Sequence, residues 1–210
     1  MGVNPATRAS VDHVAMDERA VGAVLAGGAS SRMGEPKALV ELAGKPLIGH
    51  AVAAVRDAGL DPVVIAKPDS PVPDLGVTVV DEPAEPRHPL CGIVAALRFA
   101  KTRPVVVIGC DMPFVPPALL GTFGRLADPV AVASVEGEIE PLLARYEPAI
   151  EPALHDSLKN GTALREAIAA LHPRLVTEAE LAAYGEPSRI AFNVNSPEDL
   201  ELARSLSAQP

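Results

Sequence analysis

The sequence predicts an α/β fold in which helices cover both faces of a mostly parallel central sheet. Short runs rich in Val and Ile alternate with helical segments, and 48% of the 210 residues are hydrophobic. Continuous apolar strands separated by helices are typical of parallel sheets that are buried on both sides. The length and the lack of a low-complexity linker predict one domain over residues 21–210, after a flexible extension over residues 1–20.

The first half of the chain contains the clearest strands and helices. Apolar runs short enough to be buried strands are Val21–Leu25, Val63–Ala66, Val77–Val80, Val105–Gly109 and Val130–Ser134. Between them, Pro46 is favourable in the first turn of a helix that continues to Ala58 and ends at Gly59. The pattern over Ile93–Ala100 predicts a second, amphipathic helix. Strands and crossover helices in this order place the strand ends, and any ligand, at one edge of the sheet.

The second half alternates less regularly, but each segment still has a preferred structure. The expected elements are a strand at Pro141–Tyr146, helices at Glu151–Lys159 and Thr162–Leu171, a short strand or extended segment at Arg189–Val194, and a last helix at Pro197–Ser205. The 22 prolines lie mainly at the ends of these elements, because proline lacks the N–H that helices and sheets need.

A glycine-rich segment follows the first predicted strand and has the composition of an anion-binding turn. Gly27, Gly28 and Gly34 let successive backbone N–H groups approach an anion, while Arg32 and Lys37 neutralise phosphate charge. The segment does not match a P-loop, because five residues separate Gly28 from Gly34 and Glu-Pro-Lys follows. It also lacks the dinucleotide fingerprint of a dehydrogenase, because Gly27 and Gly28 are adjacent. The alternative is a purely structural turn.

The run L-A-G-G-A-S-S-R-M-G-E-P-K, residues 25–37, resembles L-A-G-G-x-S-x-R-M-G-x-x-K, the signature of nucleotidyltransferases. Within that superfamily it is most similar to the molybdenum cofactor guanylyltransferase family, whose members are MobA-like NTP transferases. The resemblance covers residues 21–202 and implies a three-layer α/β/α Rossmann-like nucleotidyltransferase fold. It implies transfer of GMP from GTP to molybdopterin with release of pyrophosphate, and nucleotide binding by Leu25, Ala26, Gly27, Gly28, Ser30 and Lys37.

Cys110-Asp111-Met112-Pro113 ends the predicted strand Val105–Gly109, so its carboxylate should meet the glycine-rich segment at the sheet edge. Mg²⁺ prefers one or two carboxylates together with phosphate oxygens and water. The resemblance implies that Asp111 holds Mg²⁺ and binds the nucleotide, and that Asp111, Arg32 and Lys37 form the catalytic set. The alternative for Asp111 is a cap on a helix that starts near Pro116.

Two further post-strand segments resemble the family and imply nucleotide contacts. Asp81 matches a nucleotide-contacting aspartate, although such a residue is otherwise more often part of a turn. His88-Pro89-Leu90-Cys91-Gly92-Ile93 is similar to G-P-L-x-G-[IM], in which Gly92 lets the backbone approach the base or ribose. His88 replaces the usual glycine and lies either at the entrance of the site or, more typically for histidine, in an exposed loop.

Base selection is where the sequence departs most from the family. Pro36 stands where an aspartate often precedes the loop lysine. The segment at Lys67 lacks the asparagines that many guanylyltransferases use to contact the base, so Lys67 is either exposed or a substitute that contacts a guanine carbonyl. A cytidylyltransferase or a sugar-phosphate nucleotidyltransferase therefore remains the alternative.

The C-terminal part contains motifs that favour the guanylyl branch. Residues 141–146, P-L-L-A-R-Y, resemble P-L-x-A-x-Y, and residues 193–200, N-V-N-S-P-E-D-L, resemble the closing motif of the family. Asn193 and Asn195 would lie on one face of an extended segment, where their amides could bind the pterin or phosphate of the acceptor. Ser196 is expected to cap the last helix.

Composition limits the partners. A net charge of −9 and 3% aromatic residues argue against binding nucleic acid or an anionic membrane. No apolar run is long enough for a membrane helix, and Cys91 and Cys110 are expected to be buried reduced thiols, so we expect a cytoplasmic protein. The expected partners are GTP, molybdopterin and, transiently, molybdoenzymes or other proteins of cofactor biosynthesis.

Overall fold

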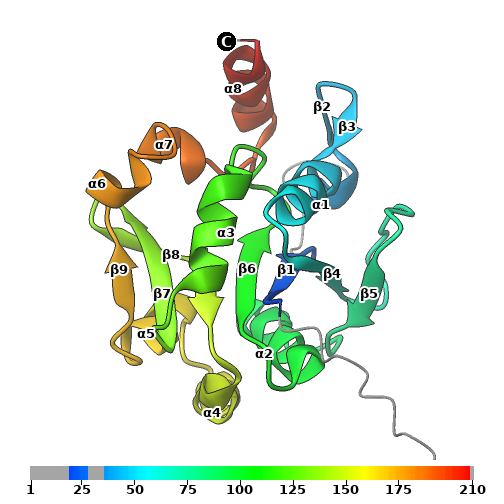
Figure 1. The fold of residues 1–210 in the computed structure, drawn as a ribbon. Helices are drawn as coiled ribbons and strands as arrows, with labels where there is room; N and C mark the ends of the chain where they lie inside the picture. The colour runs from blue at the N-terminus through cyan, green and yellow to red at the C-terminus, as the bar shows by residue number, and fades with distance from the viewer. Residues whose placement is uncertain (1–18, 28–35, 209–210) are drawn as a thin grey trace, which may run out of the picture.

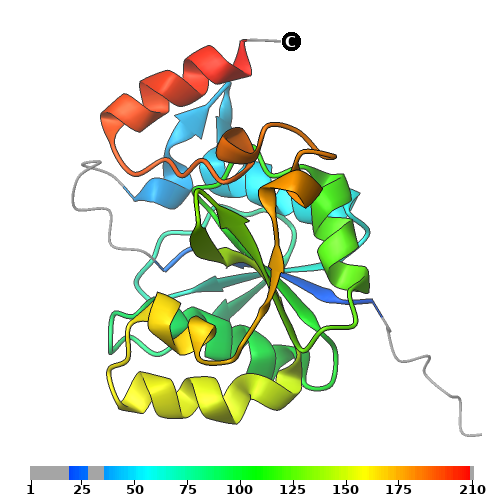
Figure 2. The ribbon, with the colours of Figure 1, turned by 90° about the vertical axis from the view of Figure 1, so that its left-hand side faces the viewer.

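The computed structural model describes residues 19–27 and 36–208, which form three layers (Figures 1 and 2). A central sheet lies between two layers of helices, as expected from the sequence. In the described part of the chain the strand order is β5-β4-β1-β6-β8-β7-β9. The strands are β1 Val21–Leu25, β4 Asp61–Ala66, β5 Thr78–Asp81, β6 Val105–Gly109, β7 Val130–Val135, β8 Glu138–Tyr146 and β9 Arg174–Val176.

The sheet is mostly parallel, and β8 is the exception among the described strands. β5, β4, β1 and β6 pair in parallel, and β9 pairs in parallel with β7, whereas β8 is antiparallel to both β6 and β7. Val105 pairs with Tyr146 and Ile108 with Leu143. The first residues of β8 therefore lie at the edge where the parallel strands end.

Helices cover both faces of the sheet because its central strands are apolar on both sides. In β6, Val106 and Ile108 pack into one cluster while Val105 and Val107 pack into another, as the alternation of side chains along a strand requires. The helices on the first face are α1 Leu47–Asp57 and α3 Pro117–Arg125, and those on the second are α2 Pro89–Ala100, α4 Glu151–Lys159 and α5 Leu164–Ala169. No helix in residues 19–27 and 36–208 is long and apolar enough to cross a membrane.

A third, smaller apolar cluster joins residues 37–47 to the C-terminal segment that ends in the last helix. The short helical turn η1 Lys37–Leu39, the hairpin β2 Glu41–Leu42 and β3 Lys45–Pro46, and the last helix α8 Pro197–Ser207 surround it. Val40 and Leu42 are buried there against Val194 and Ala203. This packing brings the segment before α8 close to Lys37, although about 158 residues of sequence separate them.

Most expected elements agree with the structure to within a few residues, and the segment 189–194 does not. The short strand or extended segment expected at Arg189–Val194 is wrong for its first residues, because Arg189 and Ile190 belong to the helix α7 Pro187–Ile190, which is preceded by α6 Glu178–Leu181. Residues 192–195 belong to neither a helix nor a strand. Pro187 fixes the first helical residue, and the Glu186 side chain accepts a hydrogen bond from the backbone N–H of Arg189. This hydrogen bond satisfies a backbone N–H of the first helical turn without a neighbouring strand, and it therefore favours a helix here.

The remaining differences concern ends of elements. α2 begins at Pro89 rather than at Ile93, because His88 caps it. Ser196 caps α8 as expected, accepting a hydrogen bond from Asp199 N at 3.1 Å. Ala20, expected in the flexible extension, is buried, and its carbonyl accepts a hydrogen bond from Asp61 N, so this residue is part of the folded body. Residues 1–18 lie outside the described part.

Candidate active site

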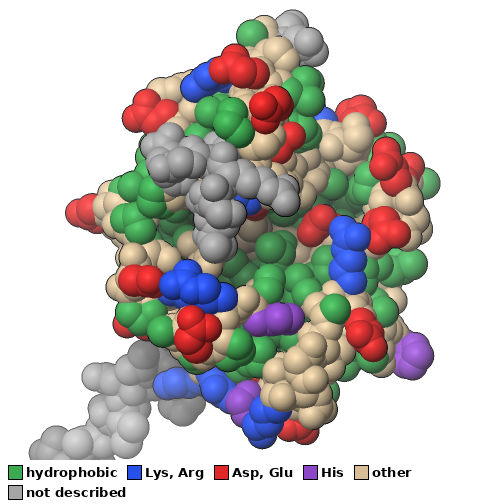
Figure 3. Space-filling view, turned by 180° about the vertical axis from the view of Figure 1, so that it is seen from behind, with side chains coloured by type: hydrophobic (Ala, Val, Ile, Leu, Met, Phe, Trp, Pro, Cys, Tyr) green, Lys and Arg blue, Asp and Glu red, His purple; other side chains and the backbone are tan. Residues whose placement is uncertain are grey.

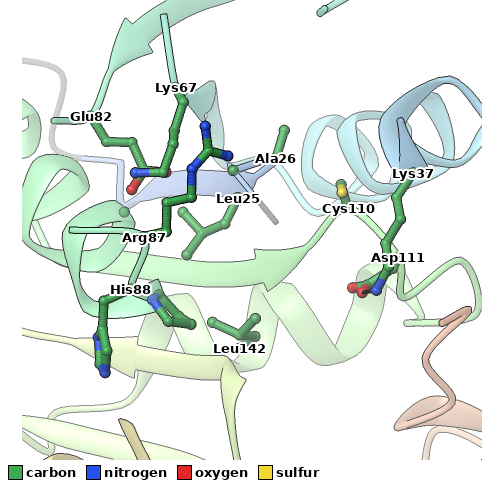
Figure 4. Close-up of a pocket in the computed structure, with 13 residues that line it drawn as sticks. Leu25, Ala26, Lys37, Lys67, Glu82, Arg87, His88, Cys110, Asp111 and Leu142 are labelled. Atoms are coloured by element: carbon green, nitrogen blue, oxygen red, sulfur yellow. Dashed lines mark hydrogen bonds and ion pairs between the residues drawn. The ribbon is translucent and has the colours of Figure 1, made fainter. Parts of the chain in front are cut away.

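A cavity of about 210 Å³ opens at the edge where β1, β4 and β6 end. Its walls come from the ends of these strands, from the segment between β5 and α2, from Lys37 and from Leu142 of β8 (Figure 4). The hollow is visible, with apolar surface at its floor, on the face shown in Figure 3. A site at the carboxyl ends of strands is where the sequence places the polar chemistry.

The cavity collects about half of the residues that the sequence assigns to the site. Leu25, Ala26, Gly27, Lys37, Gly92 and Asp111 line it. Gly28, Ser30 and Arg32 lie outside the described residues, so the structure gives no account of them. Asp81, Asn193 and Asn195 are described but are not among its lining residues.

Lys37, Asp111 and Asn195 meet at one end of the cavity. Lys37 Nζ lies 3.0 Å from Asp111 Oδ2 and also donates a hydrogen bond to Asn195 Oδ1. The side chains of Lys37 and Asp111 are 17% and 16% exposed, so the pair faces the cavity while most of each side chain is shielded. An ammonium and a carboxylate at a partly shielded edge are suited to bind a polyphosphate and its counterion.

The backbone around Asp111 explains its position. Asp111 lies two residues beyond β6, and its carbonyl accepts a hydrogen bond from Val194 N at 2.9 Å, which connects it to the segment before α8. A Cβ atom at Gly109 would lie 2.6 Å from Asp111 Oδ1, so glycine makes room for the carboxylate. Asp111 does not cap a helix, because α3 begins at Pro117 and has no side-chain cap.

The family resemblance implies a divalent metal. The side chains at the cavity fit a metal ion that has few protein ligands. The described residues contain no group of three or more His, Cys, Asp or Glu side chains arranged to hold a metal ion. Asp111 offers one carboxylate at the cavity. Mg²⁺ bound to a nucleotide commonly takes one or two carboxylates and fills its other positions with phosphate oxygens and water. Asp111 thus fits as a single protein ligand.

The opposite end of the cavity contains a buried acid–base pair. Lys67 Nζ lies 3.5 Å from Glu82 Oε1, and the two side chains are 2% and 5% exposed. Lys67 also donates a hydrogen bond to the carbonyl of Pro83 at 2.7 Å. Burial raises the pKa of the Glu82 carboxyl, and the charge of Lys67 and its hydrogen bond oppose that rise. Lys67 is therefore not the exposed lysine that is typical of surface segments.

Glycines surround the Glu82 carboxylate. A Cβ atom at Gly27 would lie 1.9 Å from Glu82 Oε1, and one at Gly92 would lie 3.2 Å from Glu82 Oε2. The first contact is impossible for a real side chain and the second is tight. Gly27 and Gly92 thus admit the carboxylate between the end of β1 and the start of α2.

Glu82, rather than Asp81, is the acidic residue after β5 that lines the cavity. Successive side chains of a strand point to opposite faces, so only one of two neighbouring acids can face the site. Both acids line a second groove formed with α2 and α4, but Asp81 is exposed, whereas Glu82 is buried and also lines the first cavity. The N–H of Glu82 donates a hydrogen bond to Ala66 O at 2.9 Å. Glu82 was not identified from the sequence, where its signal is an acid one residue beyond the expected one.

His88 lines the cavity, which is the less typical of the two positions expected for it, and it also caps α2, which was not expected. Its Nδ1 accepts a hydrogen bond from Leu90 N at 3.2 Å. Next to it, Arg87 also lines the cavity, with its guanidinium 3.2 Å from the carboxylate of Asp69. In Figure 4 the Arg87 side chain extends toward Lys67 and Ala26, whereas His88 lies on the side of Leu142.

Residues on the other side of Asp111 come from β8 and from the segment before α8. Asn193 donates a hydrogen bond from Nδ2 to Ala191 O at 2.9 Å, and Asn195 contacts Lys37. Burial raises the pKa of Glu140, with the Asp111 charge adding to the rise, while Arg165 and a hydrogen bond with Asn193 oppose it. Glu140 was not identified from the sequence, because the strand direction that brings it here is not visible locally.

The two cysteines are buried and free, as expected. Cys91 donates a hydrogen bond from Sγ to Pro86 O at 3.3 Å, and Cys110 follows β6. Burial raises the pKa of both thiols, so both stay protonated at neutral pH. We assign neither a nucleophilic role, since thiolates are the reactive form.

Comparison with known proteins finds relatives that share one name, molybdenum cofactor guanylyltransferase. A probable molybdenum cofactor guanylyltransferase of Pelotomaculum thermopropionicum is 30% identical, over 90% of this chain and 94% of its own length. The molybdenum cofactor guanylyltransferase of Pseudomonas putida is 33% identical, over 85% of this chain and 94% of its own length. Among solved structures, molybdopterin-guanine dinucleotide biosynthesis protein A of Archaeoglobus fulgidus has a similar fold, with a TM-score of 0.74 and 24% identity over 89% of this chain and 98% of that one.

A family model supports the same assignment over most of the chain. The model of the MobA-like NTP transferase domain matches residues 22–175, which include most of β1, Lys37, the Lys67–Glu82 pair and Asp111. The match ends at β9 and so does not include Asn193 and Asn195. With curated relatives at 30% identity or more along most of their length, the chain belongs to the MobA-like NTP transferase family.

Proposed function

We propose that the protein transfers GMP from GTP to molybdopterin and releases pyrophosphate, which produces the guanine dinucleotide form of the molybdenum cofactor. The observation that carries this proposal is the meeting of Lys37, Asp111 and Asn195 at the sheet edge. The choice of substrates is supported by relatives named molybdenum cofactor guanylyltransferase. Both substrates are small molecules, and contacts with molybdoenzymes or other biosynthetic proteins would be transient.

In this proposal the nucleotide extends along the cavity. Backbone groups of Leu25, Ala26 and Gly27, continued by Gly28 and Ser30, hold the phosphates, and Gly92 lets the opposite wall approach. Lys37, together with Arg32, balances the charge of the triphosphate. Asp111 would hold Mg²⁺, which supplies positive charge to the α-phosphate and the leaving pyrophosphate when it is bound.

The transfer itself needs little acid–base chemistry. A terminal phosphate oxygen of molybdopterin forms a bond to the α-phosphorus of GTP while the bond from that phosphorus to the pyrophosphate oxygen breaks. Because the attacking oxygen is already anionic, no side chain has to remove a proton. Catalysis then depends on alignment and charge stabilisation by Lys37 and its neighbours. Asn193 and Asn195 are proposed to position the acceptor, and we propose that the reaction takes place in the cytoplasm.

Pyrophosphate release tests the proposal. The purified protein is given Mg²⁺ and molybdopterin with GTP, CTP, ATP or UTP in separate reactions, and Asp111→Ala is compared with Asp156→Ala. Asp156 is a suitable control because its side chain is 71% exposed on α4. We expect release with GTP, loss of that release in Asp111→Ala, and full activity in Asp156→Ala. Release with CTP instead, or with none of the four nucleotides, would overturn the assignment.

A further inference from the structure

The buried pair Lys67 and Glu82 has no part in the phosphate chemistry proposed above. Its side chains are 2% and 5% exposed, yet both line the cavity. Removing two charges from water is costly, and a buried ion pair often stabilises a fold no better than apolar residues would. An ion pair placed in the wall of a substrate cavity therefore points to contact with a ligand.

The position of the Glu82 carboxylate limits which part of a nucleotide it can meet. It lies against Gly27 on one side and Gly92 on the other, at the end of the cavity opposite Lys37 and Asp111 (Figure 4). A carboxylate repels phosphate and accepts hydrogen bonds only. With the triphosphate at the Lys37 end, Glu82 must face groups that donate hydrogen bonds, which are the base or the ribose hydroxyls.

We propose that Glu82 selects guanine by accepting hydrogen bonds from its N1–H and its 2-amino group, and that Lys67 positions the carboxylate. The inference rests on the proposed function, because it takes GTP as the nucleotide. Guanine alone among the four bases offers two neighbouring donors on this edge; adenine and cytosine place an acceptor nitrogen beside the amino group, and uracil has one N–H between carbonyls. A carboxylate that accepts both donors therefore matches guanine and mismatches the others.

This arrangement explains how the chain can select a base without asparagines after β4. Lys67 stands in that segment, and its Nζ is bound by Pro83 O and faces Glu82 instead of solvent. The pair thus takes over base selection from a different strand end. Asp81, the acid expected to contact the nucleotide, is exposed and lines the groove beside α2 and α4 but not the cavity, whereas Glu82 lines both.

Nucleotide binding in the absence of acceptor tests the inference without relying on turnover. Isothermal titration calorimetry compares GTP with ITP, which differs from GTP only by lacking the 2-amino group, and with 2′-deoxy-GTP. A hydrogen bond to a charged group predicts that the wild type binds GTP about 10-fold or more tighter than ITP. In the Glu82→Gln variant, we expect GTP to bind more weakly. The dissociation constants for GTP and ITP should then differ by no more than about twofold.

The direction of the change in GTP affinity distinguishes hydrogen bonding to guanine from the general effect of removing a negative charge. Glu82→Gln removes a negative charge near an anionic ligand, so electrostatics alone would increase the affinity for every nucleotide. A loss specific to GTP has the opposite sign. Glu85→Gln is the matched control, since it is three residues away and its side chain is 74% exposed. It should leave the ratio of GTP to ITP affinity unchanged.

Lys67→Met tests the positioning role through pH. Among the described residues, Lys67 and the Cys91 thiol on α2 are the ionisable groups that interact with the Glu82 carboxyl, and Arg87 and His88 line the same cavity. Lys67 lowers the pKa of Glu82, so its removal raises that pKa and protonates more of the carboxyl near neutral pH. GTP affinity of Lys67→Met should then rise with pH over a range where the wild type is constant; parallel profiles would exclude the positioning role.

The outcomes distinguish this inference from the proposed function. If the wild type releases pyrophosphate with GTP and molybdopterin but Glu82→Gln keeps the preference for GTP over ITP, the inference is wrong and the function stands. It is also wrong if Glu82→Gln instead abolishes discrimination against 2′-deoxy-GTP, or if Asp81→Asn and not Glu82→Gln removes the preference. If the preference depends on Glu82 but no pyrophosphate is released with molybdopterin, the proposed transfer fails while guanine selection stands.

Discussion

Replacement of Lys37 by alanine is the most direct test of the chemistry at the sheet edge. Lys37 Nζ lies 3.0 Å from Asp111 Oδ2 and donates to Asn195 Oδ1, so its ammonium is held in place before substrate arrives. Its side chain is 17% exposed, which leaves room for a phosphate while limiting competition from water. The alanine variant removes this charge and leaves the Asp111 carboxylate without that partner.

We expect the Lys37→Ala substitution to cause a large decrease in kcat. Removing one preorganised group that stabilises developing charge costs roughly 2.7–4 kcal/mol of barrier, or about 10²–10³ in kcat. The negative charge that Lys37 balances grows at the α-phosphate and pyrophosphate as the bond breaks. Affinity for molybdopterin should change less than kcat, because the acceptor is expected at Asn193 and Asn195, and Lys37 contacts only the second of these, through one hydrogen bond.

The assay measures kcat and KM for GTP and for molybdopterin by continuous pyrophosphate release. Lys159→Ala is the matched control, because that lysine is 62% exposed at the end of α4. Lys37→Arg keeps the charge but replaces a point charge by a planar fork, so it should recover only part of the loss. A decrease in acceptor affinity as large as the decrease in kcat would refute this role for Lys37.

Three further predictions concern the wall of the cavity and the stability of the fold. Gly27→Ala should weaken GTP binding in calorimetry, because the added methyl group would lie 1.9 Å from Glu82 Oε1; unchanged affinity would show that the carboxylate is free to move. Tyr146→Phe removes a buried 2.8 Å hydrogen bond from the tyrosine hydroxyl to Pro141 O and should lower the free energy of unfolding by about 1–2 kcal/mol in urea titrations. Glu180→Gln should lower the melting temperature at neutral pH, because hydrogen bonds in the α6 capping box hold the pKa of Glu180 below its usual value of 4.5. A carboxyl with a lowered pKa stabilises the fold above its unfolded-state pKa and loses that effect as the pH falls through its folded-state pKa, so the difference should close in acid; a pH-independent difference would contradict this.

The central strands and the place of the site could be predicted from the sequence because their signals are local. Val21–Leu25 and Val105–Gly109 agree with β1 and β6 residue for residue, since an uninterrupted apolar run of this length is a buried strand. Gly27 and Asp111 each lie two residues beyond the end of one of these runs. Parallel strands end at one edge, so the sequence alone brings the two residues to the same cavity.

The partners across the sheet edge could not be predicted in the same way. The direction of β8 and the packing of α8 on the hairpin β2–β3 depend on contacts between distant segments. The first brings Glu140 toward Asp111, and the second brings Asn195 to Lys37. The start of the segment Arg189–Val194 was wrongly expected to be a strand or extended, because Pro187 and a cap from Glu186 place Arg189 and Ile190 in α7.

The sequence by itself determined the family and the α/β class, because these follow from motifs and hydrophobic periods within short segments. Only the tertiary structure decided which of two neighbouring acids lines the cavity at the sheet edge. Asp81 ends β5 and Glu82 follows it, and because neighbouring side chains of an extended chain point in opposite directions, Asp81 is exposed while Glu82 is buried beside Lys67. That choice depends on which face of the strand the rest of the protein covers, and no local pattern records it.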